Sequence, residues 1–313
     1  MADFTDIPEF LAQRIADSYD SDDAVRIVDG LRAAADRPVT LRANTLKATA
    51  DDVAAALDEA GIAYSHVPWY GDAFVLAGTR ERAVWDLDIY REGCVYLQSL
   101  SSMMPPLVLD PKAGTDILDM CAAPGGKTSQ IVALTGGEAR VTACEMNGPR
   151  AEKLQYNLEK LGCRNVQVMR VDARRLDEFF SFDQILLDAP CTGSGTICAG
   201  DERAAKRITA QLLAKVTRSQ KALLDRALTV LKPGGTLVYS TCSVLPEENG
   251  QQVAAALKRH RDCEIVPVDL PASDSAQELL ALPGELEGTL TICPTRAYEG
   301  FFIAKVKKAA RKR

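Results

Sequence analysis

Apolar residues recur along the first 90 or so positions with the spacings of a small mixed domain. Spacings of three and four residues predict helices within residues 1–36, with a break near residues 18–23. Residues 38–46 alternate like a strand, residues 49–61 read as a helix with an acidic first turn and a final glycine, and residues 63–76 hold two short strands. The pattern predicts a helical and α+β module over residues 1–92.

From residue 94 onward the pattern changes to short apolar strands separated by helical segments. A helix comes first, and we expect it to be interrupted at Pro105 and Pro106 and to end near Gly114. Strands are then predicted at residues 116–120, 140–145, 166–170, 182–188, 236–240, 264–268 and 301–306, and helices from 127 and at 150–161, 209–231 and 249–259. This alternation predicts an α/β domain over residues 93–313, with a mostly parallel, seven-stranded sheet covered on both faces.

The bulk composition adds to this picture mainly through the cysteines. A chain of 313 residues, 47% hydrophobic and 26% charged, is ordinary for a globular protein and can build a core without disulfides. The nine cysteines are scattered, none lies in a CxxC pair or a Cys/His cluster, and there are only two histidines. We therefore expect reduced thiols, with no disulfide framework and no metal site.

Charge and hydrophobicity limit where the chain acts and what it contacts. The first residues show no signal peptide, and no run of 18 apolar residues appears, so we expect a cytoplasmic chain without a membrane span. A net charge of −6 and a pI of about 5.2 weigh mildly against a nucleic-acid partner. Two basic segments offset this, at residues 201–226 and at residues 305–313, which read KVKKAARKR. For that tail, a solvated end without structure and a contact with RNA both stay open.

A strand-to-helix turn in ILDMCAAPGGKTSQI, residues 117–131, gives the first sign of a cofactor site. The strand ends at Asp119, and Pro124, Gly125 and Gly126 precede the helix. Glycines let the backbone approach a ligand closely, and free amides at a helix start attract an anion, here the carboxylate of a methionine moiety. The turn matches neither the GxGxxG of dinucleotide enzymes nor the GxxxxGK[ST] of a P-loop, which argues against a nicotinamide dehydrogenase.

Two acidic residues follow the next two strands at the same predicted sheet edge. Glu145 ends the second strand and suits two ribose hydroxyls, because a carboxylate accepts both hydrogen bonds. Asp172, after the third strand, can accept a hydrogen bond from an adenine amino group. Taken singly, Glu145 could equally be a solvated carboxylate at a strand end, and Asp172 could equally be a helix cap. In series with the glycine turn, they support a bound nucleoside cofactor.

Two cysteines follow the fourth and fifth predicted strands. Cys191 stands in LLDAPCTGSGT with Asp188 three residues earlier, and Cys242 stands in LVYSTCS. These strands are normally neighbours, so both thiols would face one pocket. A thiolate that adds to carbon 6 of cytosine makes carbon 5 able to take a methyl group, after which a base removes the carbon 5 proton. Either cysteine alone would more often be an inert buried residue, and the residues leave open which one attacks.

Several of these segments resemble the Sun-domain (RsmB/NSUN) family of RNA cytosine-5 methyltransferases. The resemblance rests on DMCAAPGGKTSQ, LLDAPCTGSGT, LKPGGTLVYSTCS and PEEN, with LRANTLK and EGFFIAKV before and after them. It covers residues 42–307 approximately and is weak over the first 36. It implies a Rossmann-like class I methyltransferase fold with S-adenosylmethionine as cofactor, of the bacterial rRNA methyltransferase type.

Carried over residue by residue, the resemblance assigns roles to the candidate site. It makes Cys242 the nucleophile and gives Cys191 a part in releasing the methylated product. Lys127 and Asp188 would also contact the target base, although a solvated first-turn lysine and a helix-capping aspartate are the plain alternatives. The cofactor-binding residues that it implies are Cys121, Ala122, Ala123, Pro124, Gly125, Gly126, Lys127, Glu145, Arg150, Asp172 and Asp188.

The implied substrate is an unpaired or extruded cytosine in structured RNA, with ribosomal RNA favoured over transfer RNA. We expect a monomer whose N-terminal module and basic tail hold the RNA through its phosphates. One departure is the stretch ICAGDERAAKR, where relatives often carry a basic residue directly after SGT. The alternatives are a transfer RNA methyltransferase, an amine methyltransferase, for which an Asn/Asp-Pro-Pro-aromatic turn would replace DAPC, and a ribosome assembly factor that has lost its chemistry.

Overall fold

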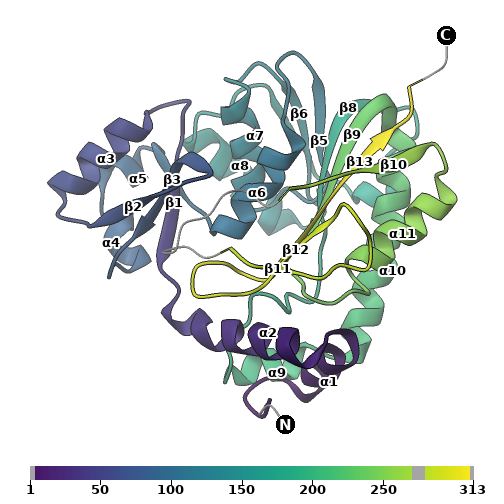
Figure 1. Ribbon diagram of the computed structural model, residues 1–313. Coiled ribbons are helices and arrows are strands. Elements are labelled where there is room, and N and C mark those ends of the chain that lie inside the picture. Colours follow the sequence, from purple (N-terminus) through teal and green to yellow (C-terminus); the bar gives the residue numbers. More distant parts are fainter. Residues whose placement is uncertain (1–3, 270–278, 311–313) are drawn as a thin grey trace.

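The computed structural model describes residues 4–269 and 279–310. The chain folds into two sheets, a small antiparallel one with strand order β2-β3-β1-β4 and a nine-stranded mixed one. In Figure 1 the small sheet and its helices lie to the left of the large sheet, and helices α1, α2 and α9 lie below it. Within the described residues, no helix is both long and apolar enough to span a bilayer.

The small sheet confirms the predicted α+β module but extends beyond its predicted end. Its strands are β1 (Val39–Ala43), β2 (Tyr64–Val67), β3 (Tyr70–Leu76) and β4 (Val95–Leu97), with helices α3 (Ala50–Glu59), α4 (Glu81–Trp85) and α5 (Asp88–Arg91). Thr49 and Asp52 form a capping box that starts α3. Because β4 pairs with β1, the predicted boundary at residue 92 falls inside the module. The three residues of β4 carry no alternation that a sequence pattern could reveal.

Among the described residues, the large sheet has nine strands in place of the predicted seven. Five are parallel, in the order β7 (Val166–Met169), β6 (Arg140–Cys144), β5 (Asp116–Asp119), β8 (Phe182–Asp188) and β9 (Leu231–Thr241). The antiparallel strands β13 (Phe301–Lys308) and β10 (Cys263–Val266) follow β9. The two unpredicted strands, β11 (Ala281–Leu282) and β12 (Leu290–Ile292), are too short to show a period of two.

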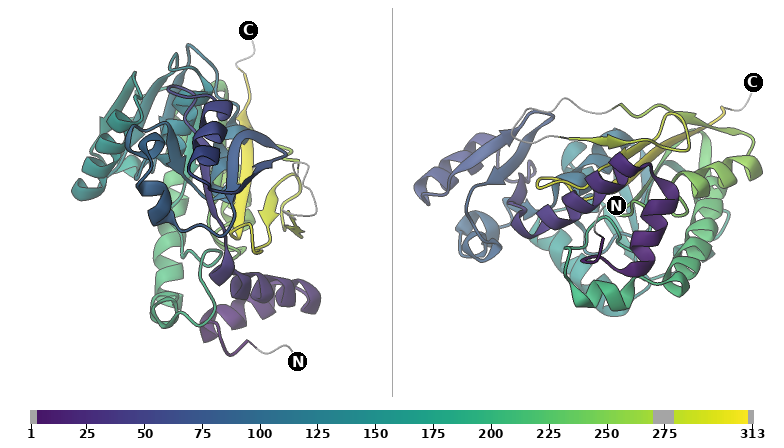
Figure 2. Two further views of the ribbon diagram at one scale, coloured as in Figure 1. Left: turned by 90° about the vertical axis from the view of Figure 1, so that its left-hand side faces the viewer. Right: turned by 60° about the horizontal axis from the view of Figure 1, so that its bottom comes forward.

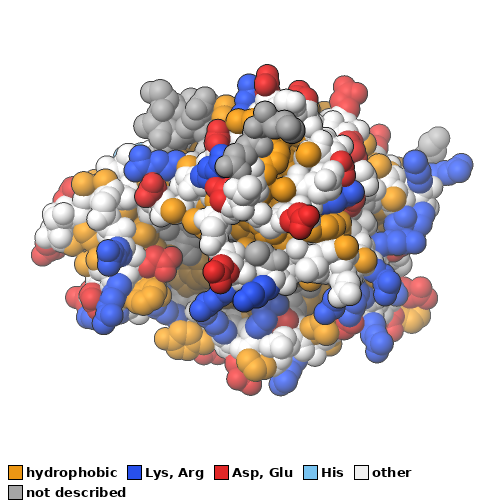
Figure 3. Space-filling view, turned by 90° about the horizontal axis from the view of Figure 1, so that it is seen from below, with side chains coloured by type: hydrophobic (Ala, Val, Ile, Leu, Met, Phe, Trp, Pro, Cys, Tyr) orange, Lys and Arg blue, Asp and Glu red, His pale blue; other side chains and the backbone are white. Residues whose placement is uncertain are grey.

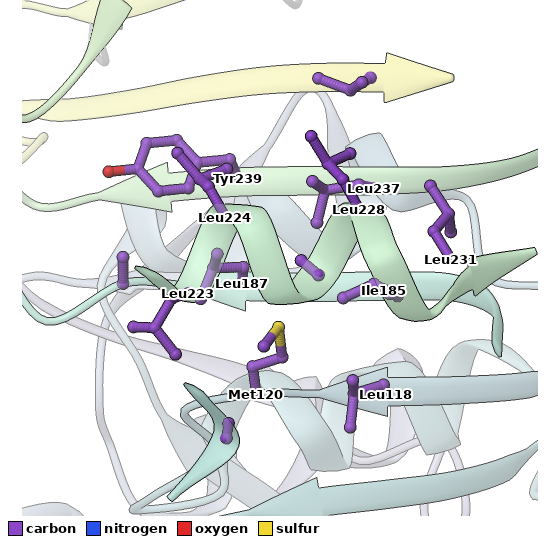
Figure 4. Packing of buried hydrophobic residues seen from close by; sticks show 14 of the residues in the cluster. Leu118, Met120, Ile185, Leu187, Leu223, Leu224, Leu228, Leu231, Leu237 and Tyr239 are labelled. Atoms are coloured by element: carbon purple, nitrogen blue, oxygen red, sulfur yellow. The ribbon is translucent and has the colours of Figure 1, made fainter. Parts of the chain in front are cut away.

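Helices cover both faces of the parallel strands, as the sequence predicts. On one face lie α6 (Leu100–Leu109), α7 (Gly126–Leu134) and α8 (Gly148–Lys160), and on the other α10 (Ala210–Val230) and α11 (Gly250–Arg259). Figure 4 shows the second face, where Leu223, Leu224 and Leu228 of α10 pack on Leu187 and Leu237. Since the strand order reverses between β5 and β8, ligands are expected at the carboxyl ends of these strands.

Helix α6 does not follow its prediction. It runs without interruption through Pro105 and Pro106, and it ends at Leu109 with Asp110 in the left-handed conformation, φ 52°. Pro106 has no N–H for the carbonyl of Ser102, but Gln98 Nε2 donates to that oxygen at 2.9 Å. A side chain from outside the helix therefore replaces the backbone bond lost at Pro106, which no pattern within the helix reveals.

The first two helices form as predicted but do not join the small sheet. They are α1 (Glu9–Ser18) and α2 (Ser21–Ala33), and the break between them falls at residues 19–20. Leu11, Ile15 and Ile27 pack in one cluster with Ile197 and Val244, which lie in loops after β8 and β9. Figure 2 shows these helices underneath the large sheet, away from the small module. Helices α1 and α2 therefore pack on the loops after β8 and β9, whereas the small sheet and α3 form a separate hydrophobic cluster.

The described part of the basic tail is neither structureless nor near the carboxyl ends of the parallel strands. Lys305 and Lys308 lie in β13, and their Nζ atoms donate to the carbonyls of Val108 and of Leu228 and Leu231. Strand β13 runs antiparallel to β9, so its end lies beside the start of β9. The alternative of a solvated end without structure is therefore wrong for residues 305–308. Their contact with RNA stays a prediction. Residues 311–313 lie outside the described residues.

Candidate active site

A cavity of about 640 Å³ opens at the carboxyl ends of β5, β8 and β9. One wall comes from the small module, with Thr40 and Tyr96, and the opposite wall comes from Asp119, Asp188 and Cys242. The buried guanidinium of Arg42 joins the two parts, because it donates to Gln98 Oε1, to the Gly126 carbonyl and to Ser129 Oγ at 2.7–3.0 Å. The small sheet is thereby fixed against the loop after β5.

The loop after β5 has the form expected of a ligand cradle. Gly125 has φ +108°, a left-handed conformation that favours glycine, and no side chain caps the start of α7 that follows. A Cβ on Gly126 would lie 2.8 Å from the Tyr96 ring, so only glycine lets β4 approach. Asp119 accepts a hydrogen bond from Thr128 Oγ1 at 2.7 Å, and burial raises the pKa of its carboxyl to about 6.

Glu145, Arg150 and Asp172 lie at the predicted sheet edge but do not line this cavity. Glu145 is buried and accepts from the Asn147 amide at 2.8 Å, which sets it apart from a solvated strand end. Arg150 pairs with Glu145 at 3.2 Å and donates to the Ala123 carbonyl at 2.9 Å, so it ties the second strand end to the glycine loop. Asp172 accepts from the Arg174 amide as a helix cap and is held by the guanidinium of the same arginine.

Lys127 and Asp188 form an ion pair inside the cavity, with 2.8 Å between Nζ and Oδ2. Lys127 also donates to Ser102 Oγ at 2.7 Å, and Asp188 Oδ1 accepts from Ser240 Oγ at 2.7 Å. Burial alone would lower the pKa of Lys127, but the nearby Asp188 carboxylate raises it above its usual range. The side chain is 13% exposed, so Lys127 is not a solvated first-turn residue; nor does Asp188 cap a helix.

The two cysteines meet as predicted, with 3.1 Å between the sulfur atoms of Cys191 and Cys242. Cys242 lines the cavity, whereas Cys191 is not among its lining residues. The pKa of the Cys191 thiol is raised well above its usual range by its hydrogen bond to Cys242, by burial, and by the charges of Cys242 and Glu248. Cys242 is therefore the sulfur that faces a ligand in the cavity.

Comparison with known families is consistent with this geometry. A family model described as 16S rRNA methyltransferase RsmB/F matches residues 106–307. The chain belongs to this family. A second model, for the ferredoxin-like domain of RsmF/B-like methyltransferases, matches residues 7–81. The family resemblance predicted from the sequence is thus confirmed, and the second match starts just before α1.

Individual relatives support the same assignment. Ribosomal RNA small subunit methyltransferase F of Shewanella sp. (strain W3-18-1) is 35% identical over 296 residues, which are 90% of this chain and 60% of that protein. The chain thus spans about 60% of the length of the curated relatives it matches. A solved methyltransferase homolog from Pyrococcus horikoshii is 32% identical, with a TM-score of 0.78 over 96% of this chain and 100% of its own. NSun6 from the same organism shares the fold, with a TM-score of 0.83 at 22% identity over 97% and 99% of the two chains. The predicted fold class is confirmed.

The cofactor of this methyltransferase family is S-adenosylmethionine, and the residues present fit it. The uncapped start of α7 offers backbone amides to a carboxylate. Glu145 is a buried carboxylate at the end of the adjacent strand, and its only cation partner in the described chain, Arg150, is shared with the loop carbonyl of Ala123. Both ends of an elongated nucleoside ligand would thus find complementary groups along one sheet edge.

Sequence reasoning missed several residues in and around the cavity. Glu248 and Glu299 fall within segments that carried the resemblance, PEEN and EGFFIAKV, but received no role. Glu299 accepts from Ser99 Oγ at 2.5 Å and lines the cavity. Tyr96 and Ser102 carried no signal, because only the packing of β4 and α6 brings them to the site.

Proposed function

We propose that this protein transfers the methyl group of S-adenosylmethionine to carbon 5 of a cytosine in ribosomal RNA. The observation that carries the proposal is the pair of thiols 3.1 Å apart, at the ends of adjacent parallel strands and beside the Lys127–Asp188 pair. Transfer to an amine requires no thiol, whereas carbon 5 of cytosine needs a covalent nucleophile. The 16S rRNA methyltransferase family of the chain supports ribosomal over transfer RNA as the substrate.

The geometry supports distinct roles for Cys242, for Cys191 and for the Lys127–Asp188 pair. The Cys242 thiolate adds to carbon 6 of the base, and the resulting electron-rich carbon 5 takes the methyl group that the cofactor supplies. A base then removes the carbon 5 proton, the carbon 5–carbon 6 double bond forms again, and Cys242 leaves as a thiolate. The protonated Cys191, 3.1 Å away, donates a hydrogen bond to the departing sulfur. Lys127 and Asp188 hold the base within the cavity.

Replacing Lys127 with methionine tests the role of the ion pair. The substitution leaves Asp188 without its cation in a partly buried site and removes a contact to the base. We expect kcat to fall by about 10²–10³-fold, the usual cost of losing one fixed electrostatic contact in an active site. Lys153→Met, on the exposed face of α8, is the matched control. A rate within about twofold of wild type for Lys127→Met would rule out this role.

The RNA strand is proposed to lie along the underside of the molecule, next to the loop that carries Cys191. Helix α9 (Glu202–Arg207) follows that loop, and an Arg207 guanidinium nitrogen would lie 3.9 Å from a Cβ placed on Gly193. Figure 3 views this underside, on which Lys and Arg side chains gather. Exposed basic residues of α9 and α10, none of which forms an ion pair among the described residues, are Arg203, Lys206, Arg207, Lys215, Arg218 and Lys221.

The exposed basic residues of α9 therefore lie next to the loop that carries Cys191. This position favours a contact between α9 and the RNA backbone beside the target base, because phosphate contacts hold an RNA in place without reading its sequence. The base itself must leave its stack to enter the cavity, so the strand on either side of it needs a firm hold.

Removing three of these charges tests the proposed RNA path. The triple variant Arg203→Ala, Lys206→Ala and Arg207→Ala should weaken RNA binding and lower the slope of log K against log salt by about 2–3, since each lost phosphate contact removes about 0.7–0.9. The control removes three exposed charges elsewhere, with Lys153→Ala, Lys258→Ala and Arg261→Ala. An equal loss of affinity and slope in both variants would show that no particular face holds the RNA.

The activity itself is tested with labelled S-adenosylmethionine and three unmodified substrates: naked 16S rRNA, small-subunit particles and transfer RNA. The RNA is digested and the labelled nucleoside is identified. Label in 5-methylcytosine from rRNA or particles supports the proposal. Label in transfer RNA alone would show that transfer RNA is the substrate in place of ribosomal RNA. Label in another nucleoside, or none despite cofactor binding, would contradict it. The proposal includes a cytoplasmic protein that acts as a monomer.

A further inference from the structure

Glu248 is a buried carboxylate that the proposed reaction does not use. It lies between β9 and α11, it is fully buried, and no ion pair with Lys, Arg or His is found for it in the described chain. Its Oε1 accepts from the Thr192 amide at 2.8 Å and from Gln220 Nε2 at 3.1 Å. Its Oε2 accepts from Thr192 Oγ1 at 2.5 Å and Ser243 Oγ at 2.6 Å. Four donors satisfy a negative charge that has no cation partner.

Three of these donors belong to the two cysteine loops. Thr192 directly follows Cys191, and Ser243 directly follows Cys242. One carboxylate thus links two loops whose cysteines are 51 residues apart in sequence and whose sulfur atoms lie 3.1 Å apart. The Gly195 amide adds a second link, because it donates to the Cys242 carbonyl at 3.1 Å. The spacing of the two sulfur atoms therefore depends in part on Glu248.

The charges around the two thiols are also unequal. The hydrogen bond with Cys242 and burial are the main causes of the raised pKa of the Cys191 thiol, and the charges of Cys242 and Glu248 add to it. Lys127 lines the cavity together with Cys242 and is paired with Asp188, and these two residues both raise its pKa, Asp188 most strongly. Tyr239, also near Cys191, is buried and its pKa is raised, so it stays neutral. Glu248 thus accepts from the amide of the residue that follows Cys191, whereas Lys127 lines the cavity together with Cys242.

We propose that Glu248 is a positioning residue that determines which of the two cysteines ionises. Its hydrogen bonds hold the two loops at one spacing, and its charge disfavours a thiolate on Cys191, so that the thiolate forms on Cys242. The proposal rests on the proposed function for its meaning in catalysis. The placement of the proton, however, is a property of the protein alone and can be measured without RNA or methyl transfer.

The test follows the alkylation of Cys191 by iodoacetamide in a Cys242→Ala background, with peptide mass spectrometry across pH. Removing the charge with Glu248→Gln should lower the midpoint pH of Cys191 alkylation by about one pH unit, which is about tenfold faster labelling below the midpoint. In the chain with both cysteines, the same substitution should raise the share of label on Cys191 and lower kcat with little change in KM for RNA.

Two further variants separate charge from structure. Glu247→Gln is the matched control, since Glu247 pairs with Arg14 of α1 and not with either cysteine loop, and its Cys191 midpoint should equal that of the parent. Glu248→Asp keeps the charge on a shorter side chain and should keep the midpoint while slowing methylation.

The midpoint of Cys191 alkylation in these variants decides between support and rejection of the proposal. An unchanged midpoint in a folded Glu248→Gln protein overturns the proposal. If Glu248→Gln does not fold, a midpoint in Glu248→Asp that falls by about a full pH unit overturns it equally, and a retained midpoint supports it. The unmutated protein could also fail to methylate any RNA while Glu248→Gln still shifts the Cys191 midpoint. That result would support the effect of Glu248 on Cys191 and would reject only the proposed function.

Discussion

Replacing Cys242 with alanine is expected to abolish 5-methylcytosine formation, with a loss on the order of 10⁴-fold or more, as for removal of other enzymatic nucleophiles. The cavity-lining sulfur is the atom that adds to the base, and the neighbouring Cys191 does not line the cavity. Without the adduct, carbon 5 stays too poor in electrons to take the methyl group. Binding of S-adenosylmethionine, measured by calorimetry, should be unchanged, because the glycine loop and Glu145 are not altered.

A control for this variant is Cys263→Ala, which changes a thiol on strand β10, away from the cavity. It should retain wild-type activity. Persistent 5-methylcytosine in the Cys242→Ala protein would mean that Cys191 attacks, and would reverse the assignment of the two cysteines. Loss of cofactor binding in the same variant would instead indicate a misfolded site, so the binding measurement is essential to the interpretation.

Replacing Cys191 with alanine is expected to trap the protein on its RNA. Cys242 can still attack, but the thiol that donates to the departing sulfur at 3.1 Å is gone. Turnover should fall by about 10²–10³-fold, in the range of losing a positioned acid or base. The adduct should appear as a protein–RNA band that survives denaturing electrophoresis and contains methylated cytosine.

The double variant Cys191→Ala with Cys242→Ala provides the control for this experiment, and it should form no band, because the attacking sulfur is absent. A band of equal intensity in the double variant would assign the bond to another residue. Normal turnover in Cys191→Ala would show that release needs no second thiol, and that the short distance between the two sulfur atoms serves another purpose.

The sequence by itself determined the class of fold and most of the candidate chemistry. Buried strands that alternate with amphipathic helices were readable over residues 116–259, because each lies within a window of about ten to twenty residues. The glycine turn and both cysteines stand at strand ends, so the rule that parallel strands end at one edge was enough to bring them together. The sulfur atoms do meet at the predicted place.

The tertiary structure decided what depends on contacts between distant segments. The strand β4, the hairpin of β11 and β12 and the placement of α1 and α2 all follow from pairing or packing partners that no local pattern encodes. Helix α6 is continuous because Gln98 donates a hydrogen bond to its Ser102 carbonyl. Lys127 forms its ion pair because β8 places Asp188 beside it. Which thiol faces the cavity, and which buried carboxylate links the two cysteine loops, is likewise a matter of three-dimensional arrangement. Periodicity is a property of one segment, whereas burial and electrostatic environment arise only when segments pack together.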